Sequence, residues 1–168
     1  MNSVDFFVSK CQTSGITETK FGICDDPDDS VKTPAYVTTD NSIPWGATVL
    51  NHSGKALNFT AVDNCVEIIG DNGAMSSRCD AMLTNDCNLI FIELKDERKK
   101  WLPHAIEQLQ ATIDSFAANN DISRYQVKRA FACNKRHPYF SVSNKELKLR
   151  FFQQNHFRLF DQDTITVE

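Results

Sequence analysis

The sequence lacks several patterns that would assign a function class at once. Its six cysteines include no C-x-x-C pair, so a zinc ribbon or a thioredoxin-like centre has little support. No stretch fits the phosphate-binding pattern G-x-x-x-x-G-K-[ST], which excludes an NTPase of that kind. The histidines are scattered and do not have the spacing of a zinc site.

The chain also lacks an excess of positive charge and a long apolar run. Its formal net charge of −4 argues against broad, non-specific clamping of nucleic acid, although local basic patches remain compatible with it. No run approaches the roughly 18 apolar residues that a membrane span needs, and the N-terminus shows no charged-then-apolar signal pattern. We therefore expect a soluble, cytoplasmic protein with no membrane partner. In that compartment we expect reduced thiols at all six positions: Cys11, Cys24, Cys65, Cys79, Cys87 and Cys133.

The length and composition fit one globular domain covering residues 1–168. The first 55 residues are rich in turn-forming residues and suggest only short strands, in YVTT and ATVL. Residues 56–69 fit either a buried strand or a short helix. The later segments predict strands, helix, strand, helix and strand in that order, which implies an α/β domain with helices against a mixed sheet.

The middle of the chain carries the clearest patterns. Residues 78–83 and 88–95 predict a hairpin with a turn at 84–86, and the second strand, NLIFIEL, is apolar enough to be covered on both faces. Residues 103–118 predict a helix, since apolar residues recur every three or four positions. That apolar stripe consists of Ile106, Leu109, Ile113 and Phe116. The segments YQVKRAFAC, NKELKLRFFQQN and HFRLFDQDTITV predict a strand, a helix and strand-like alternation.

Two charged residues end the apolar strand of the hairpin. Glu93 and Lys95 point to one face because successive side chains of a strand alternate. Charged residues at the end of a buried strand are costly unless they are paired or bind a metal. Asp80 lies on the partner strand, where pairing can bring its carboxylate beside that of Glu93. Two carboxylates, completed by water and phosphate oxygens, are a set of ligands that magnesium favours.

Asp80, twelve intervening residues and Glu93-Leu94-Lys95 resemble the signature of the restriction-endonuclease-like PD-(D/E)xK nuclease superfamily, in its compact stand-alone form. The resemblance covers residues 56–133, with Cys79 where the signature has proline. It implies an α/β fold with a restriction-endonuclease-like mixed sheet flanked by helices. It also implies that Asp80 and Glu93 bind Mg²⁺ or Mn²⁺ and that Lys95 helps to activate the attacking water.

The resemblance suggests further site residues. The family often adds an acid from an earlier helix, for which Glu67 is the first choice, Asp63 the second and Glu18 the third. Some branches add a glutamine from the helix after the lysine strand, and Gln108 lies near that place. The second E-L-K triplet, residues 146–148, provides an internal comparison, because it lies in an amphipathic helix with no upstream aspartate on a partner strand.

The expected function is metal-dependent hydrolysis of DNA. The chain is expected to act with a partner subunit, as a homo-oligomer or, by analogy only, as the effector of a defence or toxin-like system. Two alternatives stay open: an RNase that uses the same site, and a non-catalytic interaction subunit in which Glu93 and Lys95 form only a salt bridge. Basic and aromatic residues in and after the predicted strand YQVKRAFAC are weak candidates for contacts with nucleic acid. They are Lys128, Arg129, Lys135, Arg136, His137, Tyr139 and Phe140.

Overall fold

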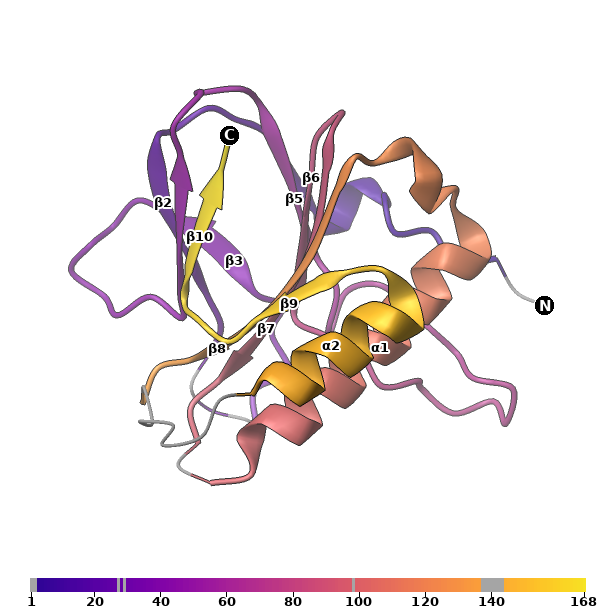
Figure 1. Cartoon of the computed structure of the whole chain (residues 1–168). Helices are drawn as coiled ribbons and strands as arrows, with labels where there is room; N and C mark the ends of the chain where they lie inside the picture. Colours follow the sequence, from indigo (N-terminus) through magenta and orange to yellow (C-terminus); the bar gives the residue numbers. More distant parts are fainter. Residues whose placement is uncertain (1–2, 27, 29, 98, 137–143) are drawn as a thin grey trace.

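The computed structural model describes residues 3–26, 28, 30–97, 99–136 and 144–168 (Figure 1). Most of the chain forms strands, and two α-helices follow the central hairpin. The strands are β1 (Gln12–Ile16), β2 (Lys20–Cys24), β3 (Tyr36–Thr38), β4 (Ala47–Asn51), β5 (Leu57–Ala61), β6 (Ala81–Thr84), β7 (Asn88–Lys95), β8 (Val127–Asn134), β9 (Arg158–Phe160) and β10 (Thr164–Val167). The helices are α1 (Trp101–Asn119) and α2 (Lys145–Asn155), with short 3₁₀ turns at Ser9–Cys11 and Ile122–Arg124.

The strands of the described residues form two sheets. The larger, six-stranded sheet has the order β1-β5-β6-β7-β8-β9 and is mixed, since β7, β8 and β9 run parallel while the other neighbours are antiparallel. The smaller sheet has the order β10-β4-β2-β3. The predicted α/β class with a mixed sheet is therefore confirmed.

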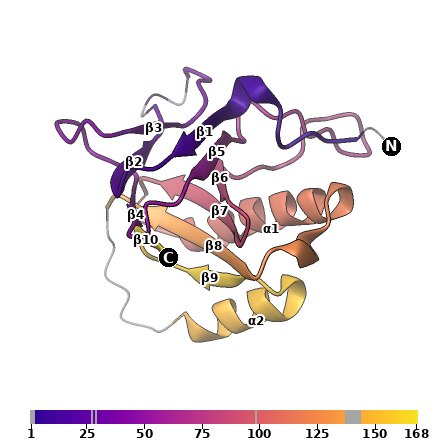
Figure 2. The same ribbon diagram turned by 90° about the horizontal axis from the view of Figure 1, so that it is seen from above.

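The two faces of the larger sheet are covered by different layers. One face packs on α1 and α2, and the smaller sheet lies on the opposite side (Figure 2). Strand β7 serves both layers, since Leu89 and Phe91 enter the core beneath the helices while Ile90 and Ile92 enter the core between the sheets. This double burial explains why NLIFIEL is apolar throughout. The smaller sheet was not predicted, and the first 55 residues supply three of its four strands.

The predicted hairpin is present, with one difference at its start. Its second strand is β7, as predicted, but β6 begins at Ala81 and not at residue 78. The carbonyls of Cys79 and Asp80 instead accept hydrogen bonds from the amides of Asp63 and Val62. The segment that carries Asp80 thus meets a turn of the chain before it joins the sheet.

Helix α1 packs as its apolar stripe predicts. It begins two residues before the predicted start, at Trp101, so Pro103 lies in its first turn, where a proline costs no internal hydrogen bond. Leu109, Ile113 and Phe116 are buried on the larger sheet. Residues 56–69, which the sequence left undecided, form β5 and then leave the sheet.

The prediction of six free thiols is wrong. Cys11 and Cys65 form a disulfide, while Cys24, Cys79, Cys87 and Cys133 are free. The two partners stand 54 residues apart, and only the fold brings them together. The cysteine pattern therefore no longer supports a reducing compartment.

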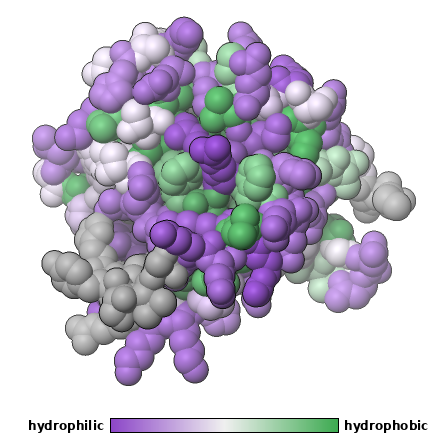
Figure 3. Space-filling model, viewed as in Figure 1, coloured by the Kyte–Doolittle hydropathy of each residue, from purple (hydrophilic) through white to green (hydrophobic). Residues whose placement is uncertain are grey.

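Hydrophilic side chains predominate on the face that carries α2, with hydrophobic ones scattered among them (Figure 3). No helix in the described part of the chain is long and apolar enough to cross a membrane.

Candidate functional site

A cavity of about 340 Å³ opens where β7 ends. Asp80 reaches it from just before β6, Lys135 from just after β8, and Gln108 from α1. The cavity is lined by Asp26, Asp63, Asp80, Glu93, Leu94, Lys95, Asp96, Glu97, Gln108 and Lys135. It therefore gathers carboxylates from both strands of the predicted hairpin and from segments far away in the sequence.

Asp80 and Glu93 come together as the sequence predicts. Ala81 pairs with Ile92 in the antiparallel ladder, so the residues next to them, Asp80 and Glu93, stand opposite each other. The backbone N–H of Leu94 donates to Oδ2 of Asp80 at 2.7 Å. Both side chains line the same cavity.

Both carboxyl groups are withdrawn from solvent, since Glu93 is only 2% exposed and Asp80 is half-buried. Burial raises the pKa of Asp80 to about 7, and the charges of Asp25 and Asp63 contribute to the rise. Burial also raises the pKa of Glu93 well above its usual range, and the charge of Asp80 raises it further, while Lys95 opposes the shift. A bound cation would favour the ionised form of both groups.

One oxygen of the Glu93 carboxylate lacks a partner. Oε1 forms an ion pair with Nζ of Lys95 at 3.2 Å, whereas Oε2 is buried and accepts no hydrogen bond from the residues that the structure describes. A buried, unpartnered carboxylate oxygen is costly, and such atoms mark places where an ion or water belongs. Oε2 of Glu93 therefore suits a small divalent cation, with the nearby carboxylate of Asp80 as its second protein ligand.

The described residues do not form a closed metal cage. No group of three or more His, Cys, Asp or Glu side chains among them is arranged to hold an ion. The fitting set is therefore two carboxylates, which leaves the other coordination positions to water or to a ligand. Magnesium keeps several waters and commonly binds proteins through one or two carboxylates, so the residues present fit Mg²⁺ or Mn²⁺ of this kind.

Two consecutive hydrogen bonds link Lys95 to the backbone near Asp80. Its Nζ donates to Oε1 of Gln108 at 2.6 Å, and Nε2 of Gln108 donates to the carbonyl of Arg78 at 3.2 Å. Four residues further along α1, Thr112 accepts a 2.7 Å hydrogen bond from the backbone N–H of Cys79. Helix α1 therefore positions the Lys95 ammonium and the chain segment that carries the acid.

Of the candidates for a further acid, Asp63 lies at the cavity and Glu67 does not. Asp63 lines the cavity, where Nε and Nη2 of Arg78 donate to its Oδ1 at 3.1 and 2.8 Å. Glu67 is exposed and lines a separate cavity with Lys10. The reason is a tight turn, closed by a hydrogen bond from the N–H of Val66 to the carbonyl of Val62, that carries the chain away from the site. Glu18, the third choice, is also exposed and does not line the cavity.

The proposed basic rim is not assembled from all of its members. Lys135 lines the cavity, and Arg136 lies nearby in an ion pair with Asp96 at 2.8 Å. Lys128, on β8, instead donates to the carbonyl of Tyr125 just before that strand, and Arg129 lies over the ring of Phe131. Lys128 and Arg129 therefore do not belong to this site. The remaining candidates, His137, Tyr139 and Phe140, lie outside the residues that the structure describes.

The second E-L-K triplet forms no comparable site. It lies at the start of α2, where residues two positions apart do not face each other. Lys148 pairs with Asp161 at 2.7 Å, which helps to hold the pKa of that carboxyl below its usual range, although burial opposes the shift. The same three-residue sequence thus contributes to the candidate site in β7, whereas in α2 it contributes an ion pair that joins the helix to Asp161.

Sequence reasoning missed Asp26. This residue follows β2 in the turn-rich segment CDDPDDS and reaches the cavity from the smaller sheet. No motif or spacing marks it, because its place depends on the packing of the two sheets. Comparisons of the chain with models of protein families, with curated proteins and with solved structures found no match.

Proposed function

We propose that this protein is a metal-dependent nuclease of the restriction-endonuclease-like type, which hydrolyses phosphodiester bonds of DNA. The observation that carries the proposal is the buried, unpartnered Oε2 of Glu93 in a cavity shared with Asp80, Lys95 and Gln108. A carboxylate pair beside a fixed ammonium group has the charge pattern needed to hold a cation and to act on an anionic substrate.

Asp80 and Glu93 would hold the cation, and a bound divalent cation would supply Lewis-acid stabilisation of a phosphoryl oxygen and a more acidic water. Lys95 cannot bind the cation while it is charged. Its ammonium would stabilise charge that develops on the phosphate or position the attacking water. Gln108 would set the position of Lys95 Nζ, because its own amide is fixed on the carbonyl of Arg78.

The charges of Lys135 and of the surrounding acidic residues would affect how the site binds an anionic substrate. Lys135 is a cation at the cavity in a position to contact a phosphate group. Asp26, Asp63 and Glu97 line the same cavity and would repel additional phosphates. This acidic lining favours the rival reading, a non-catalytic interaction subunit, in which Glu93 and Lys95 form only a buried ion pair. An RNase with the same residues is the second alternative, since none of these contacts distinguishes ribose from deoxyribose.

Titration of the protein with Mn²⁺ by calorimetry, with thermal unfolding in parallel, tests the proposal. Wild-type protein should bind the ion and unfold at a higher temperature in its presence. Glu93→Gln keeps the size of the side chain and removes its charge, so it should abolish both effects. Glu146→Gln, in the second triplet, is the matched control and should leave both unchanged. Wild-type protein that binds no divalent cation and cleaves neither DNA nor RNA would support the interaction subunit.

A further inference from the structure

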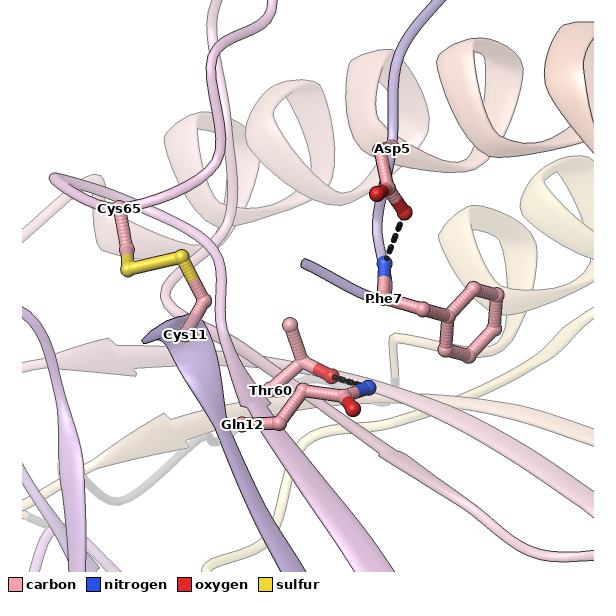
Figure 4. The surroundings of a disulfide bond; sticks show 6 residues. All are labelled: Asp5, Phe7, Cys11, Gln12, Thr60 and Cys65. Carbon is pink, nitrogen blue, oxygen red and sulfur yellow. Dashed lines mark hydrogen bonds between the residues drawn. A yellow bond between two sulfur atoms is a disulfide. The ribbon is translucent and has the colours of Figure 1, made fainter. Parts of the chain in front are cut away.

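The disulfide and the candidate metal site share one turn of the chain. Cys65 follows Asp63 by two residues, and it is bonded to Cys11 with a Cα–Cα distance of 5.7 Å (Figure 4). The turn is compact, because the amides of Cys65 and Val66 both donate to the carbonyl of Val62, at 3.2 and 2.9 Å. Cys65 and Asp63 therefore lie in one hydrogen-bonded turn.

The same turn is bonded to the segment that carries Asp80. The amide of Val62 donates to the carbonyl of Asp80 at 2.9 Å, and the amide of Asp63 donates to that of Cys79 at 3.2 Å. The Asp63 carboxylate also holds the guanidinium of Arg78. These backbone and side-chain hydrogen bonds join the turn to the segment that carries Asp80. The turn thus helps to position Asp80 relative to Glu93, together with the pairing of β6 and β7.

The other partner of the disulfide, Cys11, lies in a well-packed part of the fold. Cys11 is 5% exposed and directly precedes β1, where Gln12 pairs with Thr60 of β5 and donates to its Oγ1 at 3.3 Å (Figure 4). Ahead of it, Phe6 is fully buried, and its ring meets that of Phe116 on α1. The disulfide therefore fastens a surface turn to the edge strand of the larger sheet and to the helical core.

The disulfide also borders a separate cavity of about 260 Å³. Val8, Lys10, Glu67 and the half-buried Cys65 contribute to its walls. A small thiol fits a space of this size, which Cys65 lines, whereas Cys11 is buried. Access to one sulfur is sufficient for exchange, which proceeds by attack of a thiolate on one sulfur of the pair.

We propose that the Cys11–Cys65 disulfide is a redox control on the candidate metal site, which binds its cation tightly only while the disulfide is intact; this inference rests on the proposed function. The reductant is a dithiol. One of its thiolates attacks the sulfur of Cys65, the Cys11–Cys65 bond breaks, and Cys11 leaves as a thiolate that takes up a proton. The second thiol then attacks the mixed disulfide and releases Cys65. The protein gains two electrons and two protons, and the dithiol becomes a disulfide.

Reduction releases the turn from Cys11 but removes no metal ligand. Its effect on metal affinity therefore comes from a change in the position of Asp80. Residues that orient metal ligands typically change metal affinity by about 10- to 100-fold when they are altered. We expect a loss of about 10-fold on reduction, since β1 remains paired with β5 and the Asp63–Arg78 ion pair can still form. Asp63→Asn should give a similar loss in the oxidised protein and little further loss on reduction.

The first measurement establishes the redox state. Thiol titration of the denatured, unreduced protein should detect the four free cysteines and reach the full six only after reduction. Calorimetry with Mn²⁺ then compares oxidised and dithiothreitol-treated protein, and oxidised protein with Cys11→Ser/Cys65→Ser. The reduced and doubly substituted proteins should bind Mn²⁺ about 10-fold more weakly. Cys87→Ser, at the exposed free thiol, is the control and should bind as wild type does.

Amide hydrogen exchange provides a second measurement that does not depend on the metal. Reduction should speed exchange of the Val62 and Asp63 amides about 10-fold and leave the amides of β7 unchanged. If oxidised protein binds Mn²⁺ and reduced protein binds it equally well, the redox control is wrong and the metal site stands. If neither form binds Mn²⁺, the proposed function fails, and unchanged exchange at Val62 and Asp63 would overturn the coupling as well. Six thiols in unreduced protein would also overturn it.

Discussion

The backbone N–H of Leu94 donates a 2.7 Å hydrogen bond to Oδ2 of Asp80. The bond joins the acid that precedes β6 to the backbone of β7, between Glu93 and Lys95. It orients the carboxyl group, but an amide dipole does not supply the opposite charge that a buried carboxylate lacks. Burial therefore dominates and raises the pKa of Asp80 to about 7 in the metal-free protein.

Asp80→Asn should make the metal-free protein more stable at neutral and alkaline pH. Asp80 has a pKa of about 7 in the folded protein against an ordinary 3.8, so its destabilising effect is absent below about pH 4. The effect grows as the pH rises from about 4 to 7 and is complete above that. The difference in unfolding free energy should reach on the order of 2–4 kcal/mol. Asparagine keeps an oxygen that can accept from Leu94.

Urea unfolding of both proteins in EDTA from pH 4 to pH 9 measures this difference. The two free energies should converge near pH 4 and diverge towards pH 8. Addition of Mn²⁺ at pH 8 should stabilise wild type and not the variant, which would narrow the gap. A constant difference across the pH range would show that Asp80 ionises normally.

Lys95→Ala should abolish most cleavage and leave Mn²⁺ binding largely intact. The ammonium acts on charge that develops in the transition state, and removal of one such contact costs on the order of 10²–10³ in rate. Single-turnover cleavage of single- and double-stranded DNA and RNA, alongside calorimetry, separates the two properties. Lys148→Ala, from the second E-L-K triplet, is the matched control. If the two lysine variants lost activity equally, the assignment of Lys95 would have no basis.

Gln108→Ala should slow cleavage and leave the affinity for metal near that of wild type. The variant removes the 2.6 Å acceptor of Lys95 Nζ. We expect the ammonium then to turn further towards Glu93. Loss of such an orienting contact typically costs about 10- to 100-fold. The single-turnover rate at saturating Mn²⁺ gives the effect. Gln153→Ala, exposed on α2, provides the comparison, and a Gln108 variant as fast as Gln153→Ala would remove Gln108 from the site.

Leu109→Ala should destabilise the fold by about 2–5 kcal/mol, the range for truncation of a buried leucine. Leu109 is fully buried between α1 and the larger sheet. Leu149→Ala removes the same atoms from a side chain that is 57% exposed on α2 and should change stability by no more than about 0.5 kcal/mol. Chemical denaturation of the two variants measures the contrast. Equal losses would mean that α1 does not pack in the register described.

Local sequence was sufficient for the elements that form the centre of the site. The apolar run of β7 and the alternation that puts Glu93 and Lys95 on one face follow from strand geometry alone. The turn before β7 is also local, because Asn85 Oδ1 accepts from the backbone N–H groups of Cys87 and Asn88. Together these features predicted that Asp80 would stand beside Glu93, and the apolar stripe of α1 predicted which face of that helix would be buried.

Only the tertiary structure decided what surrounds that centre. Asp63 lies at the cavity and Glu67 does not, because the amides of the turn at Val62 and Asp63 donate to the carbonyls of residues 80 and 79. Asp26 lies at the cavity because of the way the smaller sheet packs. The Cys11–Cys65 bond likewise joins segments that are 54 residues apart. Period and spacing describe interactions between near neighbours along the chain. Contacts between distant segments depend on how whole layers fit together, and no short stretch of sequence contains that information.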